Sequence, residues 1–315
     1  MSPPQAVTET TPPERAADPA KPTVALALGA GGAKGLAHIG VIEELEAQGF
    51  QIVAIAGTSM GALIGGIHAM GKLDVYRDWV CALAKLDVLR LVDWTFSGGG
   101  LIKGERIIGT LRGLIGDTQI EELPLSFTAV ATDLDRGREV WLSHGSLFDA
   151  IRASISVPTV FRPHALHGRR LVDGALLNPV PVTPLIGARA DYVFAVSVDG
   201  VAEATLEAPP REAVDEGGYR HRISDFINRL MPQGEPRPRA QGTLDTLTQA
   251  MDLMQANLAR LRLAAYAPDL LIEMPRNIAS VYEFYRAREL IERGRLQTRA
   301  ALRDWAAPDG PQRSP

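Results

Sequence analysis

The stretch Val53-Ala54-Ile55-Ala56-Gly57-Thr58-Ser59-Met60-Gly61-Ala62-Leu63-Ile64-Gly65-Gly66 decides the fold of this chain. An apolar run leads into a Gly-x-Ser-x-Gly pattern, and a run of small apolar residues that permits a helix follows it. This order predicts a buried strand, a sharp turn and a helix, with Ser59 at the apex of the turn. Gly57 and Gly61 leave room for tight packing of the strand against the helix. Ser59 is therefore the candidate nucleophile.

A second strand and glycine turn precede this one. Residues 23–28 form a short apolar run that suits a strand buried on both faces, and Gly29-Ala30-Gly31-Gly32-Ala33-Lys34-Gly35 follows it. A glycine loop between a strand and a helix is a place where backbone N–H groups meet an anion. We expect this loop beside Ser59, because consecutive strands of a right-handed β-α-β unit turn at the same edge of the sheet.

Three kinds of anion suit such a loop. A dinucleotide pyrophosphate needs glycine where Lys34 stands, and a nucleotide P-loop needs Gly-Lys-Ser/Thr where the chain has Lys34-Gly35-Leu36. The third anion is the oxyanion of an acyl-transfer intermediate, which needs two N–H donors close to the nucleophile. The pattern favours the oxyanion, with a plain tight turn as the alternative.

A serine nucleophile also needs a base. Six histidines are available, none of them just beyond a late apolar strand: His38, His68, His144, His164, His167 and His221. Asp173 offers another solution, since it follows an apolar pair and precedes Gly174, whose backbone freedom helps to expose a carboxylate. The residues alone leave three interpretations open: an aspartate base, a histidine-dependent hydrolase, or an Asp-Gly pair that only forms a turn.

Composition limits the class of protein. The chain has 315 residues, 46% of them hydrophobic, which is enough for one large α/β core or at most two domains. Its small net charge of −4 argues against nucleic-acid binding. Cys81 is the only cysteine, which excludes an intramolecular disulfide and a cysteine-based zinc site and suits a reducing compartment. We expect a cytoplasmic protein, because the sequence shows neither a membrane-spanning apolar run nor a signal-peptide pattern.

Strand and helix patterns alternate along the chain and predict one three-layer α/β/α domain with a mainly parallel central sheet. We expect this domain at residues 23–305, with a disordered tail at 1–22, a flexible tail at 306–315 and an insertion or lid at 201–242. Later elements are expected as strands at 127–133, 138–142, 190–199 and 270–273 and as helices at 244–265 and 281–301. The leucines and methionines of 244–265 predict a helix that contributes to the core or contacts another subunit.

Four motifs, in this order, resemble the bacterial patatin-like phospholipases: the glycine loop with its basic residue at 31–35, the serine turn at 57–61, the stretch at 153–163, and Asp173-Gly174-Ala175. The likeness runs from about residue 24 to 199 and resumes at about 243–302. It implies the patatin-like fold and a Ser-Asp dyad, with Ser59 as nucleophile and Asp173 as base. It also implies an oxyanion hole formed by the backbone of Gly31 and Gly32. The other residues that support the match to the family's motifs are Gly29, Lys34, Gly35, Gly57, Gly61, Gly174 and Ala175.

The resemblance further implies an activity. Members of this family hydrolyse acyl esters of phospholipids, lysophospholipids or other lipids without a metal or cofactor, which would place this chain in lipid catabolism. A lipid ester substrate would bring the protein into peripheral contact with a membrane. The alternatives are a general carboxylesterase or thioesterase with a Ser-His-Asp triad, and a non-catalytic lipid-binding regulatory protein.

Overall fold

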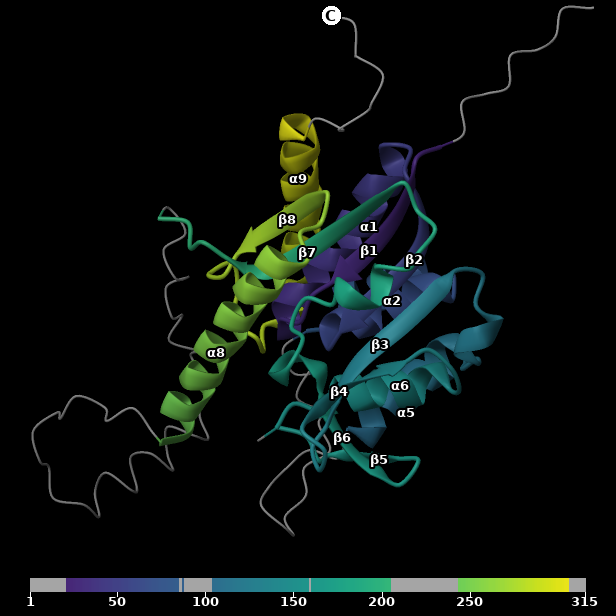
Figure 1. Cartoon of the computed structure of the whole chain (residues 1–315), viewed down its shortest axis with the longest axis vertical. Coiled ribbons are helices and arrows are strands. Elements are labelled where there is room, and N and C mark those ends of the chain that lie inside the picture. Colours follow the sequence, from purple (N-terminus) through teal and green to yellow (C-terminus); the bar gives the residue numbers. More distant parts are fainter. Residues whose placement is uncertain (1–20, 85–86, 88–103, 159, 205–242, 306–315) are drawn as a thin grey trace, which may run out of the picture.

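A mixed, mostly parallel eight-stranded sheet lies at the centre of the computed structural model, which describes residues 21–84, 87, 104–158, 160–204 and 243–305 (Figure 1). Its strands are β1 (Thr23–Leu28), β2 (Gln51–Thr58), β3 (Ser126–Asp133), β4 (Arg138–Leu142), β5 (His164–Leu166), β6 (Arg169–Asp173), β7 (Tyr192–Gly200) and β8 (Leu270–Pro275). Hydrogen-bonded neighbours follow one another in the series β5-β6-β3-β2-β1-β7-β8, and β4 also pairs with β3. Within this series β2 and β6 pair with successive stretches of β3, residues 126–130 and 131–133. The pairs among β1, β2, β3, β7 and β8 are parallel, whereas β4, β5 and β6 pair antiparallel.

Helices connect and cover these strands. The α-helices are α1 (Ala37–Ala47), α2 (Met60–Ala69), α3 (Leu73–Ala82), α5 (Glu105–Ile115), α6 (Leu147–Ser154), α8 (Thr243–Ala265) and α9 (Ala287–Asp304). Short 3-10 turns are η1 (Gly32–Leu36), η2 (Ile120–Glu122), η3 (Gly174–Leu176), η4 (Thr183–Leu185) and η5 (Phe284–Arg286).

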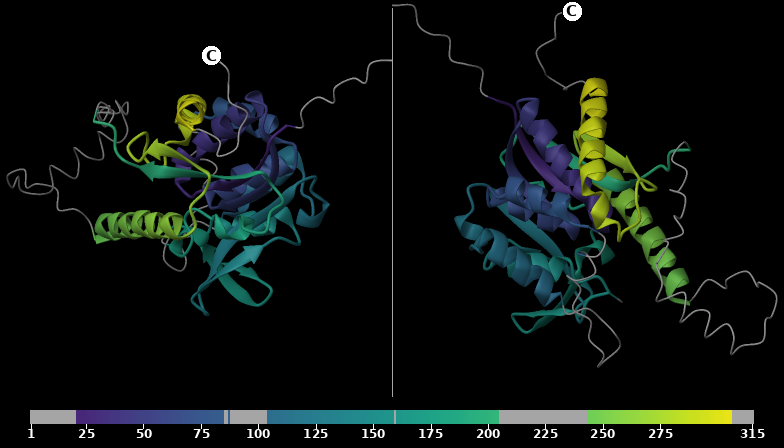
Figure 2. Two further views of the ribbon diagram at one scale, coloured as in Figure 1. Left: turned by 45° about the horizontal axis from the view of Figure 1, so that its top comes forward. Right: turned by 180° about the vertical axis from the view of Figure 1, so that it is seen from behind.

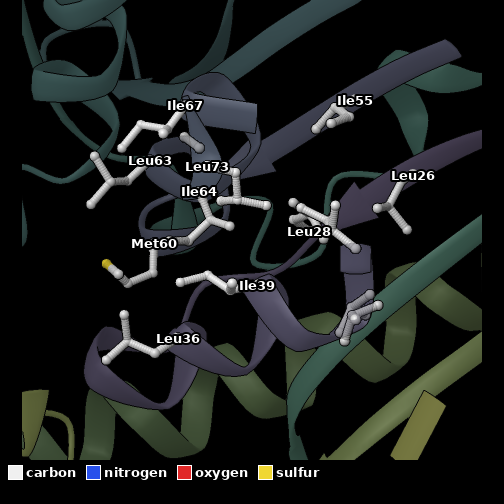
Figure 3. Packing of buried hydrophobic residues seen from close by; sticks show 14 of the residues in the cluster. Leu26, Leu28, Leu36, Ile39, Ile55, Met60, Leu63, Ile64, Ile67 and Leu73 are labelled. Atoms are coloured by element: carbon white, nitrogen blue, oxygen red, sulfur yellow. The ribbon is translucent and has the colours of Figure 1, made fainter. Parts of the chain in front are cut away.

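One face of the sheet carries the large side chains. Along β1, Val24, Leu26 and Leu28 point to this face, because successive side chains of a strand alternate between its two sides. Side chains from α1, α2, α3, α5, α6 and α9 pack onto it in one continuous apolar cluster. Figure 3 shows how Leu36 and Met60, from the two helical segments that follow the glycine turns, meet over this core. A fully buried leucine contributes roughly 1.5–3 kcal/mol, so this cluster holds the layers together.

The opposite face is lined by small residues and has a thinner cover. Ala25 and Ala27 of β1 point to it, beside alanines of β2 and β7. The chain at 180–188 and two residues of α8, Ala259 and Leu263, pack against these alanines. Figure 2 shows α8 on one side of β7 and β8 and α9 on the other. The predicted three-layer α/β architecture is therefore confirmed, and the layer that covers the large side chains is thicker than the layer that covers the alanines.

Most predicted elements are present, and one boundary is wrong. The helix expected at 281–301 begins instead at Ala287, because the preceding loop is held against the glycine turn: Ala33 N donates to Val281 O at 2.9 Å. The helix expected at 244–265 is α8, but Met254 and Leu261 are 71% and 70% exposed, so its apolar stripe is not wholly core. Residues 1–20, 205–242 and 306–315 of the predicted tails and insertion lie outside the described residues.

Candidate active site

The turn between β2 and α2 has the strained shape that its sequence predicts. Ser59 has φ 56° and ψ −120°, a left-handed conformation that side-chain-bearing residues rarely adopt. A Cβ atom on Gly57 would lie 2.4 Å from the carbonyl carbon of Gly61, and one on Gly61 would lie 2.0 Å from the carbonyl oxygen of Leu28. Both glycines are thus required for α2 to pack this closely on the strands. Strain of this kind persists where the surrounding structure enforces it, commonly at functional sites.

The glycine loop lies directly beside this turn. β1 and β2 are parallel neighbours, with Leu28 opposite Gly57. A Cβ atom on Gly61 would lie 2.8 Å from the carbonyl oxygen of Gly29, and one on Gly35 would lie 2.5 Å from Cβ of Met60. The expectation that the two turns share one edge of the sheet is therefore confirmed.

Two backbone donors of the loop are left over. The amides of Gly29, Ala30 and Ala33 donate to Val196, Pro179 and Val281 at 2.9–3.0 Å. Within the described part of the chain, the amides of Gly31 and Gly32 have no acceptor. Gly32 has φ 55°, and a Cβ atom there would lie 2.7 Å from the Val281 carbonyl oxygen, so this corner needs glycine. The loop can therefore offer two adjacent N–H groups to an anion.

Asp173 ends β6 as a buried carboxylate, 3% exposed. Its Oδ1 accepts from the amide of Ala175 at 2.8 Å, while no residue described in the structure hydrogen-bonds Oδ2. The chain turns immediately at Gly174, where a Cβ atom would lie 2.3 Å from the carbonyl oxygen of Val130. One carboxylate oxygen is thus held by the backbone and the other remains available.

β3 brings Ser59 and Asp173 together. β4 pairs with residues 129–133 of β3, a stretch that overlaps both the stretch paired with β2 (126–130) and the stretch paired with β6 (131–133). A strand has only two hydrogen-bonding edges. β4 therefore occupies one edge of β3, and β2 and β6 both lie on the other. β2 ends at Thr58 opposite Val130, and β6 ends at Asp173 opposite the next residue, Ala131. The carboxyl ends of β2 and β6 therefore meet, which places Asp173 next to Ser59.

The environment of Asp173 changes its acidity. Burial raises the pKa of Asp173 from an ordinary value of 3.8 to about 6, while the nearby Ser59 hydroxyl and the Ala175 amide oppose that rise. The two side chains are therefore neighbours, although Oδ2 makes no well-aligned hydrogen bond to any residue that the structure describes. The sequence alone does not reveal this shift, because the shift comes from burial of the carboxyl group in the folded chain.

Ser154 also belongs to the candidate site, although the sequence pattern did not single it out. Its hydroxyl accepts from the backbone amide of Ser59 at 2.9 Å and donates to the carbonyl oxygen of Val130 at 2.6 Å. It is fully buried at the end of α6. The only sequence signal was that it belongs to the stretch 153–163, which resembles the family.

His38 lies buried against the start of the glycine loop. It is fully buried, and its Nε2 lies 2.8 Å from the carbonyl oxygen of Gly29, so this nitrogen is the one that donates. Burial lowers the pKa of His38 to about 4, against the opposing hydrogen bond to Gly29. The ring is thus neutral at neutral pH and helps to hold the start of the glycine loop.

The other histidines do not supply a base in the described structure. His68 lies 3.6 Å from Glu46 and His164 lies 3.9 Å from Asp149. Burial lowers the pKa of both imidazoles. His221 lies outside the described residues, and in the remainder no histidine hydrogen-bonds the candidate nucleophile or the candidate base.

Lys34 ties the glycine loop to the end of β7. Its buried ammonium group pairs with the half-buried carboxylate of Asp199. Asp252 of α8 lies within electrostatic range of both, since its pKa is raised by burial and by Asp199 and lowered by Lys34. Lys34 therefore anchors the loop and does not point a free charge at a ligand.

The described residues offer neither a cluster of metal ligands nor a membrane-spanning helix. No three His, Cys, Asp or Glu side chains among them are grouped so that they could hold a metal ion. No helix in this part of the chain combines the length and the apolar character needed to cross a bilayer.

Known proteins share this sequence pattern. The sequence model of the patatin-like phospholipase family matches residues 26–186. An uncharacterized NTE family protein of Mycobacterium tuberculosis is 38% identical over an alignment that covers 89% of this chain and 91% of that protein. The lysophospholipase nte1 of Emericella nidulans is 30% identical over 66% of this chain, which corresponds to 14% of the fungal protein. The solved structure of VipD from Legionella pneumophila aligns with a TM-score of 0.46 and 14% identity over 91% of this chain and 67% of that one.

The family match spans the glycine loop, the strained turn at Ser59 and the Asp173 segment, and the mycobacterial relative matches along nearly the whole length of both chains. The chain belongs to the patatin-like phospholipase family, a family of lipid ester hydrolases.

Proposed function

We propose that this protein is a serine acyl hydrolase that cleaves carboxylic ester bonds of phospholipids or lysophospholipids, with Ser59 as nucleophile and Asp173 as its base. One observation carries the proposal: β2 and β6 end against each other on one edge of β3, so a strained serine and a buried carboxylate become neighbours. The family membership and the name of the fungal relative support the choice of a lipid ester.

The first step needs a proton acceptor and a nucleophile. Ionised Asp173 removes the Ser59 hydroxyl proton through Oδ2, since Oδ1 is occupied by the Ala175 amide. The Ser59 oxygen then forms a bond to the ester carbonyl carbon, and the carbonyl π electrons move onto its oxygen. A base with a pKa near 6 is mostly ionised at neutral pH and still holds a proton well enough to return it.

The negative oxygen that develops must be stabilised. The amides of Gly31 and Gly32, which donate to no residue that the structure describes, lie on the β1 side of Ser59, while Asp173 lies on the β3 side. Preorganised N–H donors at such a position contribute about 3–4 kcal/mol each to stabilising the transition state. The amino terminus of α2, which begins at Met60, adds its partial positive charge.

The reaction then proceeds through an acyl-enzyme. Protonated Asp173 delivers its proton to the departing alcohol oxygen as the carbon–oxygen bond breaks, which leaves the acyl group on Ser59. A water molecule gives a proton to Asp173 and attacks the acyl carbon, and the same donors stabilise the second oxyanion. The bond between the acyl carbon and the Ser59 oxygen then breaks, and protonated Asp173 returns its proton to that oxygen. Release of the carboxylic acid therefore restores both the serine and the ionised aspartate, and the proposed cycle uses no metal and no histidine.

The test compares three variants with the wild type on a short-chain aryl ester and on a lysophospholipid, with folding checked by circular dichroism. We expect Ser59→Ala, Asp173→Asn and Asp173→Ala each to lower turnover by at least a hundredfold while remaining folded. A folded Asp173→Asn variant with the wild-type rate would overturn the dyad and favour a histidine-dependent esterase. Tight lipid binding by a wild type that releases no fatty acid would instead indicate a non-catalytic binding protein.

A further inference from the structure

We propose that Ser154 is a positioning residue of this active site, whose hydroxyl holds the backbone of Ser59 in its strained conformation by bridging it to the end of β3. The inference rests on the proposed function, because it concerns the same nucleophile. The starting observation is the pair of hydrogen bonds from Ser59 N to Ser154 Oγ (2.9 Å) and from Ser154 Oγ to Val130 O (2.6 Å).

The bridge lies where the ladder between β2 and β3 ends. Thr58 is the last paired residue of β2 and stands opposite Val130. One residue further, the amide of Ser59 turns away from the sheet with the chain, and the hydroxyl of Ser154 accepts from that amide and donates to the β3 carbonyl. The hydroxyl thus takes the place of a direct bond between the two strands. It allows the chain to leave the sheet at Ser59 without burying an unpaired donor and an unpaired acceptor.

Ser154 does not make the local hydrogen bond that serines near helix ends usually make. A serine hydroxyl in a helix commonly donates to the carbonyl four residues earlier, as Ser156 does to Arg152 at 2.7 Å. Ser154 donates across to β3 instead. The end of α6 is therefore positioned so that the Ser154 hydroxyl hydrogen-bonds the turn at Ser59 instead of its own helix.

The same carbonyl connects the bridge to the base. A Cβ atom on Gly174 would lie 2.3 Å from the Val130 carbonyl oxygen that Ser154 binds, so the chain just after Asp173 packs on this atom. Movement at the bridge would therefore shift the nucleophile relative to its base. The bridge also occupies the Ser59 amide, so this amide is not a donor to the oxyanion.

Loss of the hydroxyl should thus affect the chemical step more than substrate binding. Without Ser154 Oγ, nothing described in the structure pairs with the Ser59 amide, and the φ 56° conformation loses a contact that enforces it. A displacement of about 1 Å in a reacting group can cost roughly a hundredfold in rate. We therefore expect Ser154→Ala to lower kcat about 30- to 100-fold, with KM changed less than about threefold.

Ser156→Ala is the matched control. Ser156 is also fully buried, lies two residues further along, and likewise accepts one hydrogen bond and donates one, both with Arg152. Its hydroxyl bonds to Arg152 and not to Ser59, and its backbone carbonyl, which accepts from the Asp173 amide at 3.0 Å, is retained in the variant. Ser156→Ala should therefore lower the midpoint of urea unfolding about as much as Ser154→Ala but leave kcat within about threefold of the wild type.

The experiment measures kcat and KM on the aryl ester, together with the rate at which a p-nitrophenyl phosphonate labels Ser59, detected by mass spectrometry. The expected result is a labelling rate that falls at least tenfold in Ser154→Ala and less than threefold in Ser156→Ala. Equal labelling of the two variants, both folded, overturns the role of Ser154. If Ser154→Ala does not fold, the nearly isosteric Ser154→Cys, with its weakly bonding thiol, takes its place, and wild-type labelling of that variant also overturns the role.

Failure of the proposed function looks different. A wild type that neither hydrolyses the ester nor takes up the phosphonate at Ser59 removes the proposed hydrolase and this inference together. A wild type that is active and labelled, with a Ser154→Ala variant that matches it, removes this inference alone.

Discussion

Ser59 and Asp173 lie at the ends of two strands that approach each other along one edge of β3: β2 stops opposite Val130 and β6 stops opposite Ala131. The two residues are 114 positions apart in the sequence, yet their relative position depends on the register of one strand. Shifting either pairing by one residue would turn the affected side chain to the other face of the sheet. The register of β3 is therefore as important to this site as the serine and the aspartate themselves.

The pH dependence of catalysis should report the buried base. Because burial raises the pKa of Asp173 to about 6 and only the ionised carboxylate can accept the serine proton, kcat/KM should rise with pH and reach half its plateau near pH 6. The measurement is ester hydrolysis from pH 4.5 to 8.5. A rate that is constant down to pH 4.5 would show that no group with this pKa is required.

The same shift predicts a pH-dependent stability. Asp173 binds its proton more tightly in the folded state, so its favourable contribution is complete below about pH 3.8 and is lost as the pH rises through about 6. The rise in the pKa of Asp173 from 3.8 to about 6 corresponds to about 3 kcal/mol. Relative to the wild type, Asp173→Asn should therefore gain about 2.5 kcal/mol in free energy of unfolding between pH 4 and pH 8, as measured by urea denaturation. A difference that does not change with pH would contradict the burial of an ionisable carboxyl group here.

Glycines of the nucleophile turn should tolerate no side chain. A Cβ atom on Gly61 would lie 2.0 Å from the Leu28 carbonyl oxygen, so Gly61→Ala should lower the free energy of unfolding by about 3 kcal/mol or more. Gly109 of α5 is the control: it is exposed, and a Cβ atom there would meet nothing within 4 Å among the described residues, so Gly109→Ala should stabilise the protein by roughly 0.5–1 kcal/mol. Urea unfolding of the two variants distinguishes close packing from a general effect of replacing glycine.

His38 should be dispensable for the chemistry. Its Nε2–H group donates to the Gly29 carbonyl and its pKa is lowered to about 4, so it holds the loop as a neutral donor. His38→Gln retains an N–H donor and should keep turnover within about tenfold, with roughly 1–3 kcal/mol less stability. Its pH–rate midpoint should remain near 6. A folded His38→Gln variant that loses a hundredfold or more in kcat would support a histidine-dependent mechanism instead.

Local sequence was sufficient for the elements around the site. The apolar run of β1, the small-residue helix α2 and the glycines on either side of Ser59 are short-range patterns, and the structure has them where they were predicted. The start of α9 could not be found this way, since it depends on a contact between Val281 and a glycine loop about 250 residues earlier. The exposure of Met254 and Leu261 was hidden for a similar reason, because helical spacing predicts an apolar face without showing what covers it.

The sequence by itself determined which residues could act here, since a serine between two glycines after a buried strand, a glycine loop and an Asp-Gly turn each follow from side-chain chemistry and backbone freedom. Only the tertiary structure decided how they act. The burial that raises the Asp173 pKa, the unpaired amides of Gly31 and Gly32 and the Ser154 bridge all arise from contacts between segments far apart in the chain. Solvent exclusion and hydrogen-bond partnership are properties of the assembled sheet, and no local pattern of residues encodes them.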